Sequence, residues 1–419
     1  MTKMNRRQLM LSTVGAMALV LAAAAGFGPA QADEKVVTIG IELPLTGADA
    51  DSATRIKNGA IMAIEEANGK GGAGGYKLGV TVLDSGTSTA GQYDPAQAAT
   101  NAKKFVADPN VIAIVGPEMS GEGKAMTPIL SAANLATITP SSTNPDITDP
   151  KFAGQYKPNG KAIYFRTVTT DAFQGPNMAN YMRDTLKVKS VYIVDDSGAY
   201  GVGISNAFEA QAKKIGVNVM GHDQLDPKEA DYTTIITKIK GLNPDAVYYG
   251  GVAQAGVKVA KQLHEIFPSV IKAGGDGMVD GGLLSAVGFP AIEGWYCTQA
   301  SPHVMDDASM SDWVARYTKE FKMTPSDYAI TAYDAVQVIV DSINRVSAGG
   351  KPVNRDTVRD AMQSANLKTL QGPVSFDENG DIVNKVISVF EITHDAKSAD
   401  DDVQHQYKYI GVAPESPTS

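Results

Sequence analysis

Two short segments of the sequence bring hydroxyl groups together directly after runs of apolar residues. They read Gly116-Pro-Glu-Met-Ser120-Gly-Glu and Thr139-Pro-Ser141-Ser142-Thr143-Asn-Pro. Each segment leads toward a predicted helix, whose first backbone N–H groups favour a negatively charged partner. Together the hydroxyl and amide groups suit a carboxylate. The alternative interpretation is that serine, threonine and proline serve here only as turn and cap residues.

A single acidic residue, Asp276, stands among glycines in the segment Ala-Gly-Gly-Asp276-Gly. This segment also follows a predicted strand, and glycine lets a ligand approach the backbone closely. A carboxylate at this position can pair with a cation. Because open α/β sheets bind ligands at the carboxyl ends of their strands, all three segments are candidates for a ligand site.

The sequence shows none of the motifs that mark a catalytic or metal centre. His264 has no second histidine at helical spacing, and residues 116–124 depart from the phosphate-binding loop. The glycines of residues 198–203 do not follow the dinucleotide fingerprint. Residues 377–381 lack the glycine and glutamate positions of a calcium loop and predict a tight turn instead. We therefore expect a non-enzymatic protein with no cofactor and no metal site.

The elements that must position these residues alternate between strand and helix along the chain. Apolar runs predict strands over residues 36–42, 77–83, 111–115, 190–194 and 245–250, and helical spacing or a leading proline predicts helices near residues 56–67, 95–106, 201–215 and 231–242. This alternation is typical of parallel sheets with helices on both faces. Two such series favour an α/β fold of two doubly wound lobes over one oversized sheet.

The composition fits a soluble globular protein of two or three domains, with 419 residues of which 43% are hydrophobic and 20% charged. The single cysteine, Cys297, excludes an internal disulfide. A net charge of −9 argues against a nucleic-acid partner, because such a protein needs basic patches to displace the counterions of the phosphates.

The first 32 residues have the pattern of a cleavable signal peptide. Lys3, Arg6 and Arg7 precede an uncharged apolar stretch that ends in the small-residue cleavage site Ala-Gln-Ala at residues 30–32. A transmembrane anchor is the alternative, but the acidic sequence from Asp33 argues against it. The paired arginines also resemble a twin-arginine signal, which leaves the export route open. Removing the three basic residues changes the net charge from −9 to −12, so we expect a free, acidic and extracytoplasmic product.

Six motifs, in order and over nearly all of residues 36–409, resemble the leucine/isoleucine/valine-binding family of periplasmic substrate-binding proteins of ABC transporters. They are Ile39-Gly-Ile-Glu-Leu-Pro-Leu-Thr-Gly47, Asn58-Gly-Ala with Glu65-Glu66, Thr139-Pro-Ser-Ser-Thr143, Phe165-Arg-Thr with Gln174-Gly-Pro176, Tyr248-Tyr-Gly-Gly251 and Gly372-Pro-Val-Ser-Phe-Asp-Glu-Asn-Gly380. This resemblance favours the ligand-site interpretation over the turn-residue interpretation.

The resemblance implies the type I periplasmic binding protein fold, in which two Rossmann-like lobes are joined by three hinge crossovers. By position, the crossovers are expected near Thr169, Gln299 and Ser388. The implied domains are a signal peptide at 1–32, lobe 1 at 33–168 and 300–387, lobe 2 at 169–299 and 388–410, and a flexible tail at 411–419.

The resemblance also implies how a ligand is held. In family members the ligand's α-carboxylate is bound by the groups that match Ser120, Ser141 and Thr143. The α-ammonium is bound by the second of these loops and by an acid on the other lobe, which Asp276 matches. An aromatic ring that Tyr200 matches covers the site. This assignment agrees with the general preference of anions for hydroxyls and amides and of cations for carboxylates.

Three departures from the family pattern change the side-chain pocket. Ser52 and Val252 stand where the amino-acid receptors have aromatic residues, so they are candidate pocket residues. Asp276 replaces a glutamate that is longer by one methylene. The disulfide of some relatives is also absent. A branched-chain amino acid is therefore the family default for the ligand rather than a conclusion from these residues.

We expect a monomeric periplasmic receptor that closes on a small amino acid and delivers it to an inner-membrane ABC permease. One alternative is a receptor of the same fold for another small ligand, such as an amide, a urea-like molecule or an aromatic carboxylate. A periplasmic hydrolase is another alternative, although no nucleophile and base stand at motif spacing in the sequence.

Overall fold

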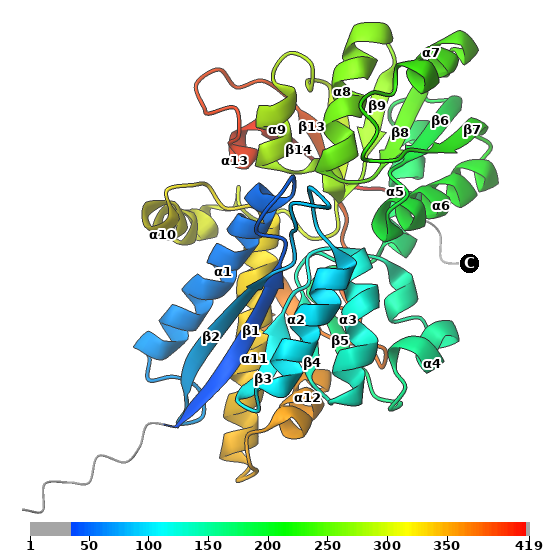
Figure 1. Cartoon of the computed structure of the whole chain (residues 1–419). Coiled ribbons are helices and arrows are strands. Elements are labelled where there is room, and N and C mark those ends of the chain that lie inside the picture. The colour runs from blue at the N-terminus through cyan, green and yellow to red at the C-terminus, as the bar shows by residue number, and fades with distance from the viewer. Residues whose placement is uncertain (1–34, 416–419) are drawn as a thin grey trace, which may run out of the picture. The chain divides into compact units, whose positions relative to one another are not determined.

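The computed structural model describes residues 35–415, and the predicted signal peptide at residues 1–32 lies outside them. The described chain contains two large β-sheets, each covered by helices (Figure 1). We call the part built on the five-stranded sheet lobe 1 and the part built on the seven-stranded sheet lobe 2. Within residues 35–415, no helix combines the length and the apolar character that crossing a bilayer requires.

Lobe 1 is built on five parallel strands in the order β2-β1-β3-β4-β5. These strands are β1 (Val36–Leu43), β2 (Lys77–Asp84), β3 (Val111–Val115), β4 (Ala136–Thr139) and β5 (Tyr164–Arg166). Every residue of β3 is buried, which explains its continuous apolar run, because helices cover both faces of the sheet. A separate small hairpin pairs β11 (Asn366–Thr369) with β12 (Gly372–Ser375).

Lobe 2 is built on seven strands in the order β14-β13-β10-β9-β8-β6-β7. The parallel strands are β6 (Ser190–Asp195), β7 (Asn218–Gln224), β8 (Ala246–Gly250), β9 (Ile271–Gly274) and β10 (Trp295–Gln299), and the antiparallel ones are β13 (Ser388–Ile392) and β14 (Tyr407–Val412). Val412 pairs with Ser388, and the Ala413 N–H donates to the Ile387 carbonyl at 2.8 Å. The prediction of a flexible tail that begins at residue 411 is therefore wrong, because residues 411–413 pair at the edge of this sheet.

Helices cover both faces of each sheet (Figure 1). In lobe 1, α1 and α11 pack on one face and α2 and α3 on the other. In lobe 2 the two faces alternate along β6: Ile193 packs with α6, whereas Val194 packs with α7 and α8. The helices are α1 (Ala50–Gly69), α2 (Pro95–Ala107), α3 (Ser120–Ala132), α4 (Ala153–Tyr156), α5 (Asp171–Asp184), α6 (Ala199–Lys214), α7 (Thr233–Leu242), α8 (Ala253–Ile266), α9 (Gly281–Val287), α10 (Ser311–Phe321), α11 (Asp327–Ala348), α12 (Arg355–Gln363) and α13 (Val403–Gln406).

The chain passes between the two lobes three times, before α5, after β10 and before β13. These connections are hydrogen-bonded to one another. The Thr169 N–H donates to the Ala300 carbonyl at 2.9 Å, and the Ser388 hydroxyl donates to the Ser301 carbonyl at 2.8 Å. The middle connection thus contacts both of the others, so the three cross side by side.

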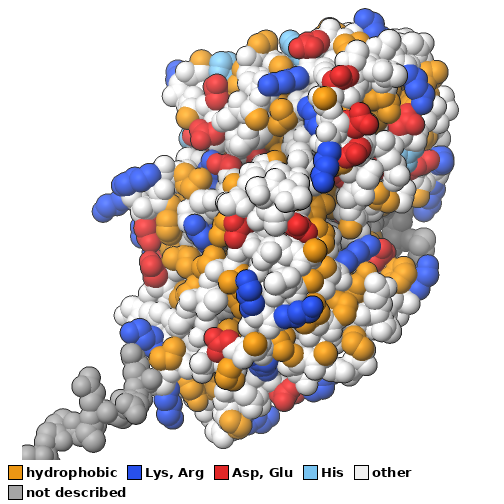
Figure 2. All heavy atoms as spheres, in the orientation of Figure 1, with side chains coloured by type: hydrophobic (Ala, Val, Ile, Leu, Met, Phe, Trp, Pro, Cys, Tyr) orange, Lys and Arg blue, Asp and Glu red, His pale blue; other side chains and the backbone are white. Residues whose placement is uncertain are grey.

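The surface carries both signs of charge. Figure 2 shows lysine and arginine side chains scattered among acidic and apolar ones over one face of the molecule. On the face drawn, the basic side chains do not gather into the single patch that phosphate backbones attract.

Candidate functional site

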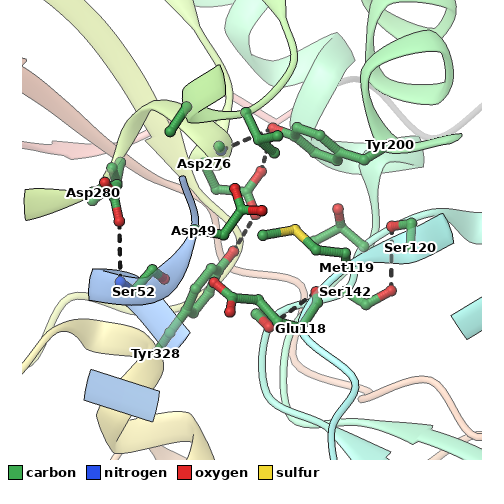
Figure 3. A pocket seen from close by; sticks show the side chains of 16 residues that line it. Asp49, Ser52, Glu118, Met119, Ser120, Ser142, Tyr200, Asp276, Asp280 and Tyr328 are labelled. Atoms are coloured by element: carbon green, nitrogen blue, oxygen red, sulfur yellow. Dashed lines mark hydrogen bonds between the residues drawn. The ribbon is translucent and has the colours of Figure 1, made fainter. Parts of the chain in front are cut away.

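Residues of both lobes line one cavity (Figure 3). All seven candidate residues from the sequence analysis line this cavity, namely Ser52, Ser120, Ser141, Thr143, Tyr200, Val252 and Asp276. The cavity lies where the chain leaves β3, β4, β8 and β9, at the carboxyl ends of these strands. The topology therefore brings together residues that are up to 224 positions apart, from Ser52 to Asp276.

Hydroxyl groups gather at the lobe 1 side of the cavity, where α3 begins. Ser120 is the first residue of α3, and its hydroxyl accepts a hydrogen bond from the Ser142 hydroxyl at 3.2 Å. The Ser141 hydroxyl donates to the Glu118 carbonyl at 3.2 Å. The Thr143 hydroxyl is buried and lies near the Asp171 carboxyl group, whose ionised form it favours. The Ser120 hydroxyl and the first N–H groups of α3 suit an anionic group of a ligand.

Arg166, at the end of β5, holds the loop that carries these hydroxyls. Its side chain is fully buried, and its two Nη atoms donate to the carbonyls of Ser142 and Asn144, each at 2.8 Å. Its Nε pairs with Asp381 Oδ1 at 2.7 Å. Asp381 ends the turn of residues 377–381, in which the Asp377 side chain accepts from two backbone N–H groups. The tight turn predicted there thus positions the counter-charge of Arg166.

Asp276, directly after β9, is the acceptor of three side-chain hydrogen bonds. Tyr200 and Gln174 donate to its Oδ1, each at 2.6 Å, and Tyr328 donates to its Oδ2. Burial raises the pKa of Asp276, and the three donors oppose that rise because they favour the ionised form. The site therefore holds this carboxylate in place and prepares it for a cation.

Hydrogen bonds cross from one lobe to the other near the cavity. The Tyr328 phenol lies on α11 of lobe 1, whereas its acceptor follows β9 of lobe 2. The Ser52 N–H donates to Asp280 Oδ2 at 3.1 Å. The Asn144 side chain donates to the Ala199 carbonyl at 2.7 Å. These contacts hold the two lobes together over the cavity.

The cavity is acidic. Asp49, Glu118 and Asp280 line it together with Asp276, and all four side chains are buried. Burial is the main cause that raises the pKa of Asp49 to about 6 and of Asp280 to about 7. Burial also raises the pKa of Glu118 well above its usual value, and the nearby charge of Asp49 adds to this. No lysine, arginine or histidine is among the residues that line the cavity within the described chain.

Sequence reasoning missed four chemically important lining residues, which are Asp49, Glu118, Asp280 and Tyr328. Glu118 stands inside one of the two hydroxyl segments, so its neighbourhood was a usable signal. Asp280 is the N-cap of α9, which predicts a local role at the helix end. No signal in the sequence placed Tyr328 near Asp276, because this contact depends on how the two lobes pack.

Within the described residues, the lining of the cavity contains neither histidine nor cysteine, and Cys297 lies fully buried in β10. Among residues 35–415, no group of histidine, cysteine, aspartate or glutamate side chains has an arrangement that could hold a metal ion.

The sequence of this chain is similar to those of one known protein family. The sequence profile of a family described as periplasmic binding protein matches residues 36–398. The chain belongs to the periplasmic binding protein family. One relative in this family, the Leu/Ile/Val-binding protein BraC3 of Rhizobium johnstonii, is 31% identical over 384 residues, which cover 90% of this chain and 97% of the relative. The resemblance to the leucine/isoleucine/valine-binding family is confirmed.

Solved structures agree with this family assignment. LivJ from Streptococcus pneumoniae, a branched-chain amino acid transporter substrate binding protein in complex with isoleucine, has a TM-score of 0.75 at 22% identity, over 90% of this chain and 100% of LivJ. A solute binding protein of an ABC transporter from R. palustris, in complex with benzoate, has a TM-score of 0.74 at 20% identity, over 91% of this chain and 97% of its own. The two-lobed periplasmic binding protein fold is thereby confirmed.

Proposed function

We propose that this protein is the periplasmic substrate-binding component of an ABC importer, which closes on a small α-amino acid and delivers it to an inner-membrane permease. The observation that carries this proposal is the pairing of two unlike groups across one cavity. The Ser120 hydroxyl at the start of α3 suits a carboxylate, while Asp276 on the other lobe suits an ammonium. A zwitterion needs both groups at once.

The names of relatives support the same class of ligand. The relative from Rhizobium johnstonii is a Leu/Ile/Val-binding protein, and LivJ was solved with isoleucine. In this chain Ser120, Ser141 and Thr143 would hold the carboxylate, Asp276 the ammonium, and Tyr200 would cover the ligand. Ser52 and Val252 would contact its side chain.

Binding would act through the relative position of the lobes. Hinges near Thr169, Gln299 and Ser388 would let the lobes separate, and a ligand that contacts both would favour the closed state. The closed protein would dock on the permease as a monomer. Lobe boundaries at residues 168/169, 299/300 and 387/388 are part of this proposal.

The N-terminal pattern supports export with removal of residues 1–32. Intact-mass measurement on protein recovered from the periplasm should give a chain that begins at Asp33. Retention of Met1 to Ala32 would contradict cleavage. Blocking the twin-arginine pathway, in parallel with the general secretory pathway, would identify the route.

A thermal-shift panel of amino acids, short amides and aromatic carboxylates tests the proposed ligand class. A ligand at 100 times its dissociation constant stabilises the folded state by about 2.7 kcal/mol, which raises the melting temperature measurably. The bound amino acid should be recovered unchanged, because the proposal excludes turnover. A response to benzoate or to amides but to no amino acid would favour the alternative receptor, and conversion of the ligand would favour a hydrolase.

A further inference from the structure

The part of the cavity near Ser52, which would hold the side chain of an amino-acid ligand, is acidic. Ser52 lies near the carboxyl groups of Asp280 and Glu118. Its N–H donates to Asp280 at 3.1 Å, and its hydroxyl favours the ionised form of Glu118. The charges of Asp49 and Asp280 in turn act on Glu118, which places all three acids near one another. Figure 3 shows Asp49, Glu118 and Asp280 among the side chains around the cavity.

Within residues 35–415, no cationic side chain balances these acids. Arg55 is the basic residue whose charge acts on Asp280, but its donors are directed elsewhere. Its Nε and one Nη bond to Asp51, its other Nη bonds to Thr324, and a further bond reaches the Asp401 carbonyl at 3.1 Å. Within residues 35–415, neither Asp49, Glu118 nor Asp280 forms an ion pair with lysine, arginine or histidine.

Glu118 also has hydrogen-bonding capacity that the protein leaves unused. Its side chain is only 5% exposed and lines the cavity, and its Oε2 has no hydrogen-bond partner within the described residues. Asp280, by contrast, already accepts from Ser52 and from Leu283 as the cap of α9. Asp49 accepts from the Tyr93 N–H at 3.0 Å through Oδ2. A buried acceptor without a donor is unfavourable, so the free oxygen of Glu118 calls for a donor from a ligand.

An aliphatic amino acid cannot supply that donor. Its ammonium is matched by Asp276, and its carboxylate is matched by the hydroxyl end of the cavity. Its side chain would then press a methyl or methylene group against Glu118 and Asp49, leaving the free oxygen without a partner. A nitrogen with a positive charge at the end of the side chain would satisfy both acids.

We infer that the cavity binds an α-amino acid whose side chain ends in a second ammonium group, such as ornithine or lysine, with Glu118 and Asp49 as its counter-charges. This inference rests on the proposed amino-acid receptor function and names its substrate class. Ser52 takes part because its small side chain leaves room where a larger residue would fill the cavity.

Calorimetric titration of the unmodified protein with ornithine and with norleucine gives the direct test. The two amino acids have the same chain length, and ornithine carries an ammonium where norleucine carries a methyl group. We expect ornithine to bind at least about tenfold more tightly, since a charge pair formed in a buried site is worth at least that factor. Tighter binding of norleucine would overturn the inference and leave the amino-acid receptor function standing.

The variant Glu118→Gln assigns the effect to one carboxyl group. It should weaken ornithine binding about tenfold or more and change norleucine binding by less than about threefold. Glu378→Gln is the matched control, because Glu378 is exposed in a turn of lobe 1. It should change neither affinity. Equal losses for both ligands in Glu118→Gln would overturn the assignment, because they would indicate a structural role.

If the proposed amino-acid receptor function is wrong, the titrations give a different result. If neither ornithine, norleucine nor any other α-amino acid binds the folded unmodified protein, the receptor proposal itself fails. The comparison of ornithine with norleucine needs no variant, so it stands even if Glu118→Gln does not fold. Asp49→Asn then provides the second measurement, and it should weaken the binding of ornithine more than the binding of norleucine.

Discussion

The Tyr328 phenol donates a hydrogen bond to Asp276 across the boundary between the lobes. Tyr328 lies in the first turn of α11, which packs in lobe 1, and Asp276 follows β9 of lobe 2. Both side chains are at least nine-tenths buried and line the same cavity. This bond forms only when the lobes are together, so it links the closed state to the carboxylate proposed to bind the ligand's ammonium.

Replacing Tyr328 with phenylalanine removes this bond and keeps the ring. A hydrogen bond to a charged group contributes about 1.5–3 kcal/mol, so Tyr328→Phe should raise the dissociation constant of the best amino acid roughly tenfold or more. Tyr333→Phe is the matched control, because Tyr333 lies on the same helix and donates to Glu66 away from the cavity at 2.7 Å. Calorimetry on both variants checks the prediction, and equal affinities for Tyr328→Phe and the parent would contradict it.

The two ends of the proposed ligand should respond differently to mutation. Asp276→Asn removes a buried counter-charge and should cost about 2–5 kcal/mol of binding free energy. Ser120→Ala removes one hydroxyl beside backbone amides and should cost about 1–3 kcal/mol. Titration of both variants with the same amino acid gives the order directly. If Asp276→Asn binds as tightly as the parent, a neutral or purely anionic ligand becomes the better assignment.

Arg166 should be needed to hold the loop of residues 141–144, which carries the hydroxyl groups, rather than to contact a ligand directly. Arg166→Lys keeps the charge but loses the fork of donors that holds Ser142, Asn144 and Asp381. Because those carbonyls are buried, the substitution should lower the free energy of unfolding by about 2 kcal/mol or more and weaken binding as well. Arg183→Lys, at a pair with Asp184 that is 39% and 48% exposed, should leave the stability in urea unfolding nearly unchanged. Equal stability of the two variants would contradict a role for Arg166 in holding the loop.

The strands and most helices could be predicted from the sequence because a parallel sheet buried on both faces leaves a strong pattern. Val111–Val115 reads as an uninterrupted apolar run, and the helix that contains Ile56 and Ala60 repeats its apolar residues at helical spacing. The candidate residues Ser120, Ser141 and Asp276 follow such strands directly, so the position of the strand ends located them.

Contacts between distant segments could not be predicted in the same way. Tyr328 lies 52 positions after Asp276, inside a helix with no motif, and only the packing of the lobes brings them together. Acidic residues are usually exposed, so the burial of Asp49 and Glu118 could not be predicted from their residue types. This burial follows from the way α1 and α3 lie around one cavity. The sequence analysis therefore did not predict that Asp49, Glu118 and Asp280 lie together in the cavity.

Ligand binding should make the protein more compact if the crossovers act as hinges. Small-angle scattering should give a smaller radius of gyration at saturation than without ligand, because contacts such as Asn144 to Ala199 close the lobes. Asp276→Asn at the same ligand concentration should remain closer to the unliganded value. An unchanged radius at saturation would indicate a preformed, rigid cavity.

Two buried acids, Glu42 in β1 and Glu122 in α3, should make the free energy of unfolding depend on pH. Glu42 and Glu122 are both fully buried, and within residues 35–415 neither forms an ion pair with a basic side chain. Burial is the main cause that raises the pKa of Glu42 to about 8 from its ordinary value of 4.5. Burial and the charge of Glu42 raise the pKa of Glu122 as well. Between pH 4.5 and about 8 the folded state therefore keeps a proton on Glu42 that the unfolded chain releases.

The free energy of unfolding should then fall as pH rises through this window, by up to about 1.4 kcal/mol per pH unit from Glu42. Glu42→Gln keeps an uncharged side chain of the same shape and removes that slope. Its stability relative to the parent should rise steadily from pH 4.5 to pH 8 in urea unfolding. Asp49 and Asp280 titrate in both proteins, so the difference between the two curves reports Glu42 together with the change that its charge causes in the neighbouring Glu122. Glu229→Gln, which alters an exposed residue, should run parallel to the parent, and a parallel curve for Glu42→Gln would show that Glu42 is already ionised in the folded protein.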